Sequence, residues 1–194
     1  MSWDTTACFK AVCTAFCDFQ RNPSDMKVVQ DLQRQIDVIL GLTSHGAILN
    51  DFTPKQLVYA ETLSALVTII NDPNLKVSLY QKSLMALVQL AEDRDTKASL
   101  QTDFQLGSSV VQFILRHHTT TSSNKQIVYQ ALVLLEKMTY GTQCDINNIY
   151  MADMLKLLVS SIYTAAHEYC IPSLAVLANL CRHNNQVKTF IKTM

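Results

Sequence analysis

Apolar residues recur every three or four positions along most of this chain, which is the spacing that buries one face of an α-helix. The first such pattern spans 4–20, with Asp4 as its expected N-cap, and the second spans 25–40 behind Asp25. The stretch 41–53 has no regular pattern and is predicted to be a loop. The remaining patterns predict helices at 54–71, 74–92, 94–103, 107–117, 124–140, 144–149, 150–164, 170–182 and 184–193.

One helical segment occurs three times in the sequence. Its copies begin at Leu84, Leu132 and Leu174, and each has Leu or Met at its first, fourth and seventh positions. Residues 83–100 align with 173–190 without a gap. A period of about 40–47 residues is typical of armadillo and HEAT units, whose helices bury such positions against neighbouring helices. The sequence therefore predicts an all-α fold, an armadillo/HEAT-like right-handed superhelical solenoid.

This prediction divides the chain into an N-terminal helical cap and three armadillo-like repeats of one continuous solenoid. The cap takes residues 1–53, and the repeats take 54–103, 104–149 and 150–194. Units of this kind stack into rods whose long grooves hold other proteins. The expected class is therefore a binding scaffold and not an enzyme.

The composition favours helices and a surface that is partly covered. Only 4 Gly and 4 Pro occur, whereas a sheet with many turns needs more of both. Charged residues make up 16%, below the ~25% that is typical, which predicts surface covered by a partner or by further repeats. The net charge is zero, so direct binding of nucleic acid is not expected. No apolar run approaches the ~18 residues of a membrane span.

The sequence carries few candidates for chemistry. It contains no phosphate-binding glycine loop, no HExxH motif and no GxSxG motif. His167 and Cys170 share a helix face, but zinc normally takes four ligands and no second pair has a fitting spacing. Asp93 and Asp95 lie at a helix junction, where helix caps explain them better than a catalytic carboxylate pair. We expect no catalytic residue, no cofactor site and no metal site. The six cysteines form no CxxC pair, which favours free thiols in a reducing setting.

A polar run, Thr-Thr-Thr-Ser-Ser at residues 119–123, lengthens the turn inside the second repeat. One interpretation is a solvated loop. The other is a phosphorylatable docking loop.

The expected binding site is the groove along the long helices of the repeats. In armadillo repeats, a Trp and, four residues later, an Asn commonly clamp an extended peptide there. Only Asn179 keeps the usual residue type, and the only Trp is Trp3, outside the repeats, which disfavours a receptor for basic peptides. Asn179 could hydrogen-bond a bound backbone, or it could only tie neighbouring helices together. The candidate groove residues are Met85, Gln89, Val133, Lys137, Ala175 and Asn179.

Several segments carry a family resemblance. Residues 174–184 are Leu-Ala-Val-Leu-Ala-Asn-Leu-Cys-Arg-His-Asn, and residues 190–194 are Phe-Ile-Lys-Thr-Met. With Thr-Ala-Cys-Phe-Lys at 6–10 and Asp-Pro-Asn at 72–74, they resemble the N-terminal armadillo domain of the cancerous inhibitor of protein phosphatase 2A family. The resemblance spans the whole chain and is densest at 174–194.

The resemblance implies a non-enzymatic scaffold that opposes phosphatase 2A by engaging its B-prime regulatory subunits. It also implies contact with a BRCT-repeat DNA-damage adaptor in mitosis, and a cytoplasmic location with a nuclear or chromatin-associated pool in mitosis. Family members are longer and end in a coiled-coil tail, with dimer contacts beyond residue 194. This chain is therefore expected to be a fragment or a short form, and a homodimer is expected only with the longer region.

Two alternatives to that function stay open. One is a general armadillo adaptor of the transport or adhesion type. The other is a structural module that self-associates, because Phe190 and Ile191 have no following unit to cover them in this sequence.

Overall fold

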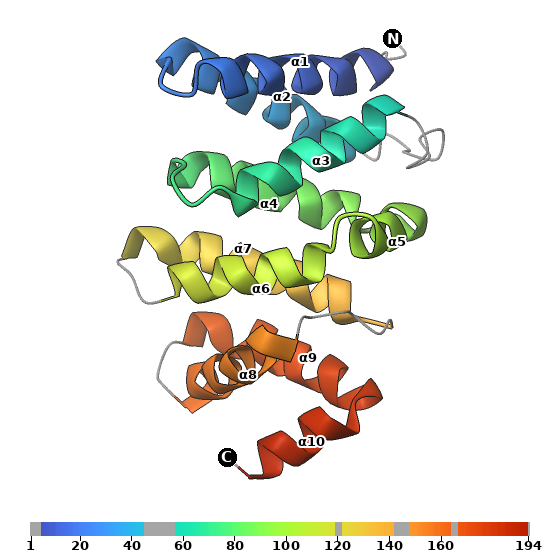
Figure 1. The fold of residues 1–194 in the computed structure, drawn as a ribbon, viewed down its shortest axis with the longest axis vertical. Coiled ribbons are helices and arrows are strands. Elements are labelled where there is room, and N and C mark those ends of the chain that lie inside the picture. The colour runs from blue at the N-terminus through green and yellow to red at the C-terminus, as the bar shows by residue number, and fades with distance from the viewer. Residues whose placement is uncertain (1–4, 45–56, 119–121, 142–147, 164–166, 194) are drawn as a thin grey trace. The chain divides into compact units, whose positions relative to one another are not determined.

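The computed structural model describes residues 5–44, 57–118, 122–141, 148–163 and 167–193. In these ranges the chain forms helices joined by short turns, and it forms no strand, which confirms the all-α fold class (Figure 1). The helices are α1 (Thr5–Arg21), α2 (Met26–Ser44), α3 (Leu57–Asn71), α4 (Val77–Leu90), α5 (Arg94–Thr102), α6 (Leu106–His117), α7 (Ser122–Thr139), α8 (Asn148–Tyr163), α9 (His167–His183) and α10 (Asn185–Lys192).

The chain divides into two compact units, Met1–Leu100 and Gln101–Met194. The first unit combines the predicted cap with most of the predicted first repeat, and the second contains the other two repeats. The division into a cap and three repeats stays a prediction.

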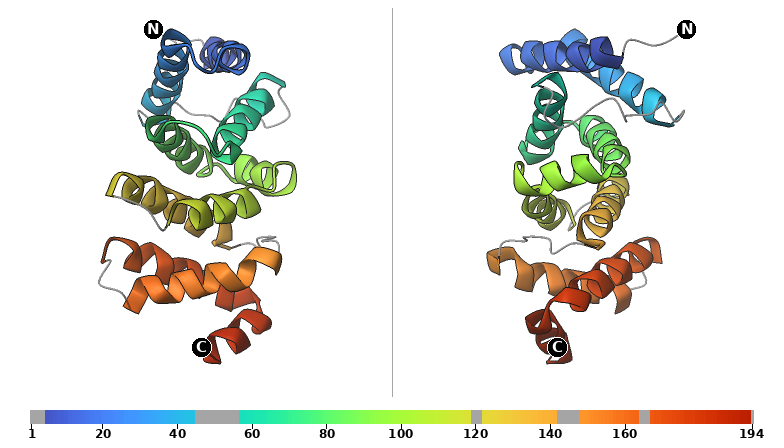
Figure 2. Two further views of the ribbon diagram at one scale, coloured as in Figure 1. Left: turned by 60° about the vertical axis from the view of Figure 1, so that its left-hand side comes forward. Right: turned by 90° about the vertical axis from the view of Figure 1, so that its right-hand side faces the viewer.

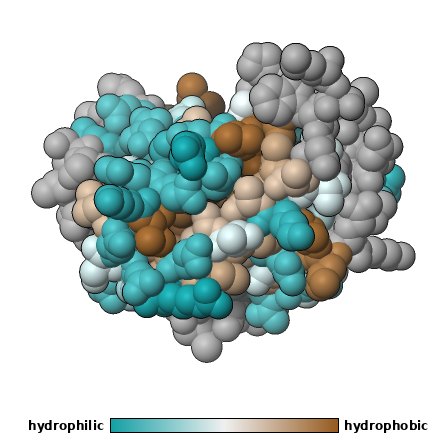
Figure 3. Space-filling view, turned by 90° about the horizontal axis from the view of Figure 1, so that it is seen from above, coloured by the Kyte–Doolittle hydropathy of each residue, from teal (hydrophilic) through white to brown (hydrophobic). Residues whose placement is uncertain are grey.

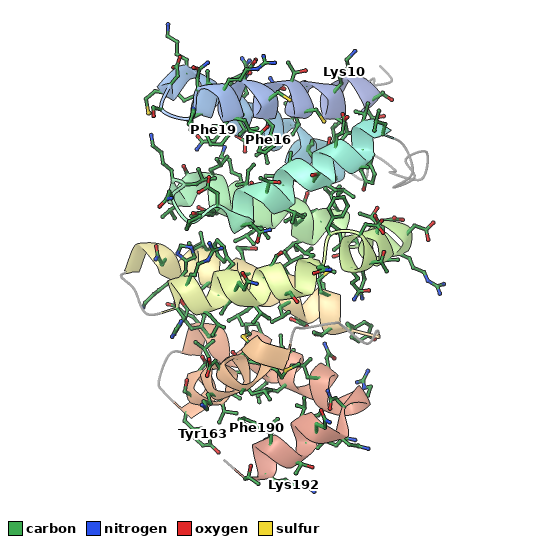
Figure 4. The ribbon with its side chains drawn as sticks, viewed as in Figure 1. Lys10, Phe16, Phe19, Tyr163, Phe190 and Lys192 are labelled. Carbon is green, nitrogen blue, oxygen red and sulfur yellow. The ribbon has the colours of Figure 1, made fainter. Side chains whose placement is uncertain are left out.

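The first unit is built from two layers of helices. α1 packs against α2 and α3, and α4 packs against the same two helices, so α1 and α3 form one layer and α2 and α4 the other. Figure 4 shows Phe16 and Phe19 pointing from α1 toward the rest of the unit, while Lys10 points away. Figure 3 shows many hydrophilic residues on the face that carries α1 and α2. The buried core includes Phe9, Val12, Leu32, Ile36, Tyr59, Leu63, Leu66, Leu84 and Leu87.

The second unit repeats this arrangement. α6 packs against α7 and α8, α9 packs against the same two helices, and α10 follows on α9. The orange α8 and the red-orange α9 lie side by side in both views of Figure 2. Its core includes Leu106, Val110, Phe113, Ile114, Leu132, Leu135, Met138, Leu155 and Leu158.

Side-chain caps begin several of the helices. The carboxylate of Asp25 accepts the backbone N–H two residues later (2.8 Å), and that of Asp93 accepts the N–H three residues later (2.8 Å). Both bonds are typical of N-caps, so the predicted capping roles of these aspartates are confirmed. Asn184 caps α10 through two such bonds. Asp95 lies in the first turn of α5, where its negative charge interacts favourably with the helix dipole.

The predicted loop at 41–53 is wrong in its first four residues, because α2 continues to Ser44. The Thr43 hydroxyl lies 3.0 Å from the Ile39 carbonyl and 3.1 Å from the Leu40 carbonyl, one turn back. These contacts, and a hydrogen bond from the Thr43 hydroxyl to Gln89 of α4, hold the last turn in helical form. The predicted loop at 119–123 is wrong at its last two residues, because Ser122 and Ser123 begin α7. The expectations for Asp4, for residues 45–53 and for residues 119–121 fall outside the described residues.

α4 begins at Val77, three residues later than predicted. The backbone N–H of Asn74 donates to the Asp72 carboxylate (2.9 Å), which folds an Asx turn. The buried Tyr80 hydroxyl then donates to the Asp72 carbonyl (2.5 Å) and accepts the N–H of Leu75 (3.0 Å). These bonds extend the turn to the start of α4.

The last long helix also differs from its prediction. α9 begins at His167, three residues before the predicted start at residue 170, and it continues through Pro172. The short helix predicted at 144–149 is also wrong at its end, because Asn148 already belongs to α8. The preceding residues of that predicted helix lie outside the described ranges.

Candidate protein-binding surface

The six predicted groove residues are divided between the two units. Met85 and Gln89 lie on α4 of the first unit, and both are half-buried. The other four lie in the second unit on α7 and α9, which pack against each other. Of these, Asn179 is buried and the others, Val133, Lys137 and Ala175, are half-buried.

Asn179 joins α9 to the C-terminal end of α7. Its Nδ2 donates to the Glu136 carbonyl (3.2 Å) and to the Thr139 hydroxyl (3.3 Å). An amide nitrogen carries two hydrogens, so its donor capacity is used inside the unit. The residue is 8% exposed. Of the two interpretations of Asn179, the structure therefore favours the tie between helices over the clamp on a peptide.

Gln89 forms the equivalent contact in the first unit. It occupies the aligned position of the repeated segment, and its Oε1 accepts a hydrogen bond from the Thr43 hydroxyl of α2. Thr43 lies in the last turn of α2, and Thr139 lies in the last turn of α7. The hydroxyl of each also contacts the carbonyl four residues back in its own helix. The same polar tie thus recurs in both units. The two threonines were not predicted from the sequence, although each precedes its amide partner by about one repeat period.

Exposed apolar side chains lie on α7 and α9 of the second unit, two helices that pack against each other. Ile171 is 78% exposed, Leu174 is 48% exposed, and Tyr129 on α7 is 37% exposed. Ile171, Leu174 and the exposed Ala178 follow one helix face at the spacing i, i+3 and i+7. We call Tyr129, Ile171, Leu174 and Ala178 the α7–α9 surface.

The exposure of Leu174 corrects the sequence analysis. The repeated segment predicts burial at its first Leu, and the structure buries that position completely at Leu84 and Leu132. In the third copy, α9 packs against α7, α8 and α10, and these helices leave Leu174 48% exposed. Leu177 and Leu180 of the same copy remain buried.

Ile171 was also missed as a surface residue, although the alignment of the copies contains a signal. It aligns with Gln81 of the first copy, which is half-buried, so a polar position has become apolar and exposed in the third copy. When an exposed residue is large and apolar in one copy and polar in the aligned copy, an interaction surface is favoured at that position.

A hollow of about 360 Å³ separates α8 from α10. Met151 and Leu155 of α8 line one side, and Val187 and Phe190 of α10 line the other. Figure 4 shows Phe190 on the side of α10 that faces α8. Phe190 and Ile191 are half-buried.

Burial raises the pKa of the Cys13 thiol, which more than offsets the hydrogen bond with Thr62 (3.3 Å), so the thiol stays protonated. The described cysteines are free thiols. No group of three or more His, Cys, Asp or Glu side chains in the described ranges is placed to hold a metal ion. No helix in this part of the chain is both long and apolar enough to cross a bilayer.

The fold therefore defines an all-α protein built from packed helix pairs, with an apolar surface on one pair. The family model for the CIP2A N-terminal region matches residues 3–194, and the chain belongs to this family. The match confirms the family resemblance found in the sequence. No solved structure matches the chain.

Proposed function

We propose that this chain is a non-enzymatic, armadillo-like scaffold that opposes protein phosphatase 2A by engaging its B-prime regulatory subunits. The observation that carries the proposal is the family match over residues 3–194. The two-layer stacking of helix pairs inside each unit supports the solenoid part, because armadillo repeats pack in this way.

The α7–α9 surface is the proposed contact region. Exposed apolar side chains on a protein surface favour partner binding, and aromatic residues such as Tyr129 are enriched at interfaces. The earlier groove candidates Val133 and Ala175 lie on the same two helices. Asn179 contributes by fixing α9 against α7, which keeps the surface rigid.

The wider role follows the same proposal. The chain would also contact a BRCT-repeat DNA-damage adaptor in mitosis, and it would act in the cytoplasm with a chromatin-associated pool in mitosis. Direct contact with nucleic acid is not part of the proposal, because the net charge is zero. A homodimer would need the longer region of the family.

A pull-down tests the proposal. The purified chain 1–194 would be immobilised and incubated with purified B-prime subunits, with the phosphatase catalytic subunit alone as the control. We expect the B-prime subunit to be retained at tens of micromolar and the catalytic subunit to pass through. Absence of retention from a chain that is folded by circular dichroism would contradict the phosphatase part of the proposal.

A self-associating structural module is the second candidate. Ile171 and Leu174 carry it, because exposed apolar side chains can also bind a second copy of the chain. Sedimentation velocity separates the two functions. A binding scaffold stays monomeric over a wide range of concentrations, whereas a self-associating module sediments faster as the concentration rises. The general armadillo adaptor has no specific observation in its favour.

A further inference from the structure

The turn between α1 and α2 is the most accessible stretch of the described chain. Every residue from Gln20 to Lys27 is exposed, and no other described stretch has an exposed run of this length. One backbone hydrogen bond, from Asp25 N–H to the Asn22 carbonyl (3.1 Å), closes the turn. Among the described residues, the Ser24 hydroxyl has no hydrogen-bond partner. An enzyme that acts on a protein side chain needs such an exposed, weakly held segment.

A basic residue lies three positions before this serine in the sequence. Arg21 is three residues upstream, and its side chain is 75% exposed. Within the described part of the chain it pairs with Asp18 at 3.5 Å, and an exposed pair of that kind contributes little free energy. The same spacing occurs once more in the sequence, between Arg116 and Thr119, but Thr119 is a threonine and lies outside the described residues.

We propose that Ser24 is a phosphorylation site for a basophilic serine kinase, one that selects an arginine three residues before the acceptor. Such kinases recognise substrates by charge pattern, so Arg21 would bind acidic side chains of the kinase. The Ser24 oxygen attacks the γ-phosphorus of ATP, and the bond from that phosphorus to the bridging oxygen of ADP breaks. The catalytic aspartate of the kinase accepts the hydroxyl proton, and ADP leaves.

The modification would change the charge of the turn. Asp18 and Asp25 are balanced by Arg21 and Lys27, so the turn is close to neutral. Phosphoserine adds about −1.5 to −2 charges at neutral pH. The first turn of α2 and Arg21 favour the phosphate, whereas the carboxylate of Asp25 opposes it. The phosphorylated turn would therefore present an acidic patch at one end of the first unit.

A kinase assay on the folded chain 1–194 tests the proposal. The chain would be incubated with ATP and calmodulin-dependent kinase II, and phosphate would be located by peptide mass spectrometry. We expect one phosphate per chain, on Ser24, and none in Ser24→Ala. Arg21→Ala should slow the reaction by about tenfold, the effect of losing an interaction of about 1.4 kcal/mol.

Arg34→Ala is the matched control, because Arg34 is equally exposed and also pairs with an aspartate three residues away. This variant should react at the wild-type rate. Phosphate on another residue, an equal rate for Arg21→Ala, or no phosphate on the folded chain would each overturn the proposal. Binding of phosphatase subunits does not enter this assay, so its outcome is independent of the proposed function.

Discussion

Two buried serines occupy the same position in two copies of the repeated segment. Ser83 and Ser173 are both fully buried, and neither hydroxyl has a hydrogen-bond partner in the described part of the chain. The second copy has Ala131 at this position, which is equally buried. A buried hydroxyl without a partner destabilises a protein because its lost hydration is not replaced. Alanine is therefore the better residue at this position of the fold.

We predict that Ser83→Ala raises the free energy of unfolding by about 1–2 kcal/mol. Part of this gain is the higher helix propensity of alanine, about 0.5 kcal/mol. Ser64→Ala is the matched control, because Ser64 is an exposed serine in the helix α3 and gains only the propensity term. Urea unfolding followed by circular dichroism measures both. Equal gains for the two variants would show that the Ser83 hydroxyl carries no burial penalty.

The buried Tyr59 hydroxyl predicts a loss of stability in alkali. Burial raises the pKa of Tyr59 to about 12, although its hydrogen bond with Thr96 (2.9 Å) acts in the opposite direction. An unfolded tyrosine titrates near 10. Between these two values the unfolded chain loses the proton first, so the stabilisation is complete below pH 10 and is lost as the pH rises toward 12.

Comparison with Tyr59→Phe isolates this effect, because phenylalanine does not titrate. By pH 11 the wild type should lose about 1.4 kcal/mol of unfolding free energy more than the variant does, relative to pH 8. Urea midpoints at pH 8, 10 and 11 provide the measurement. Parallel losses in the two proteins would contradict the burial of the ionisable hydroxyl.

At the scale of the element, the three copies of the repeated segment form the helices α4, α7 and α9, whose equivalent side chains are buried to different extents. Leu87 and its equivalents, Leu135 and Leu177, lie in the core of their units. Leu174 does not, although its equivalents do. The burial of a leucine therefore depends on which helices pack on its own, which a sequence period alone does not specify.

We predict that Leu87→Ala lowers the free energy of unfolding by about 2–5 kcal/mol, because it removes a buried side chain and leaves a cavity. Leu174→Ala should lower it by less than about 1 kcal/mol, because the side chain is about half-exposed and surface changes are small. Thermal unfolding of both variants measures the difference. Similar shifts in the melting temperature would contradict the assignment of Leu174 to the surface.

Periodicity was sufficient to predict the helices and most of the core, because apolar spacing directly records which face of a helix is buried. The caps at Asp25 and Asp93 were also predictable, since they depend on neighbouring residues only. The start of α4 was not, because the Tyr80 hydroxyl reaches back to a turn eight residues away. The partner of Asn179 does not depend on neighbouring residues, because the hydrogen bond joins helices about forty residues apart, and only the repeat period indicates it.

At the scale of the whole molecule, the chain is an all-α member of the CIP2A N-terminal family. Its two units share the pairing of helices and the polar tie between long helices. The second unit differs by its exposed α7–α9 surface. We therefore expect binding of the B-prime subunit to depend on α9. We expect an exposed apolar residue of the first unit to have no role in that binding.

Titration calorimetry of the chain 1–194 with a purified B-prime regulatory subunit tests this account most directly. The wild type should bind at tens of micromolar or more tightly, and Ile171→Asp should weaken binding by at least about tenfold, as expected for a residue inside an interface. Met26→Asp, at an exposed apolar residue of the first unit, should bind as the wild type does. Unchanged affinity for Ile171→Asp, or no binding by the folded wild type, would contradict the account.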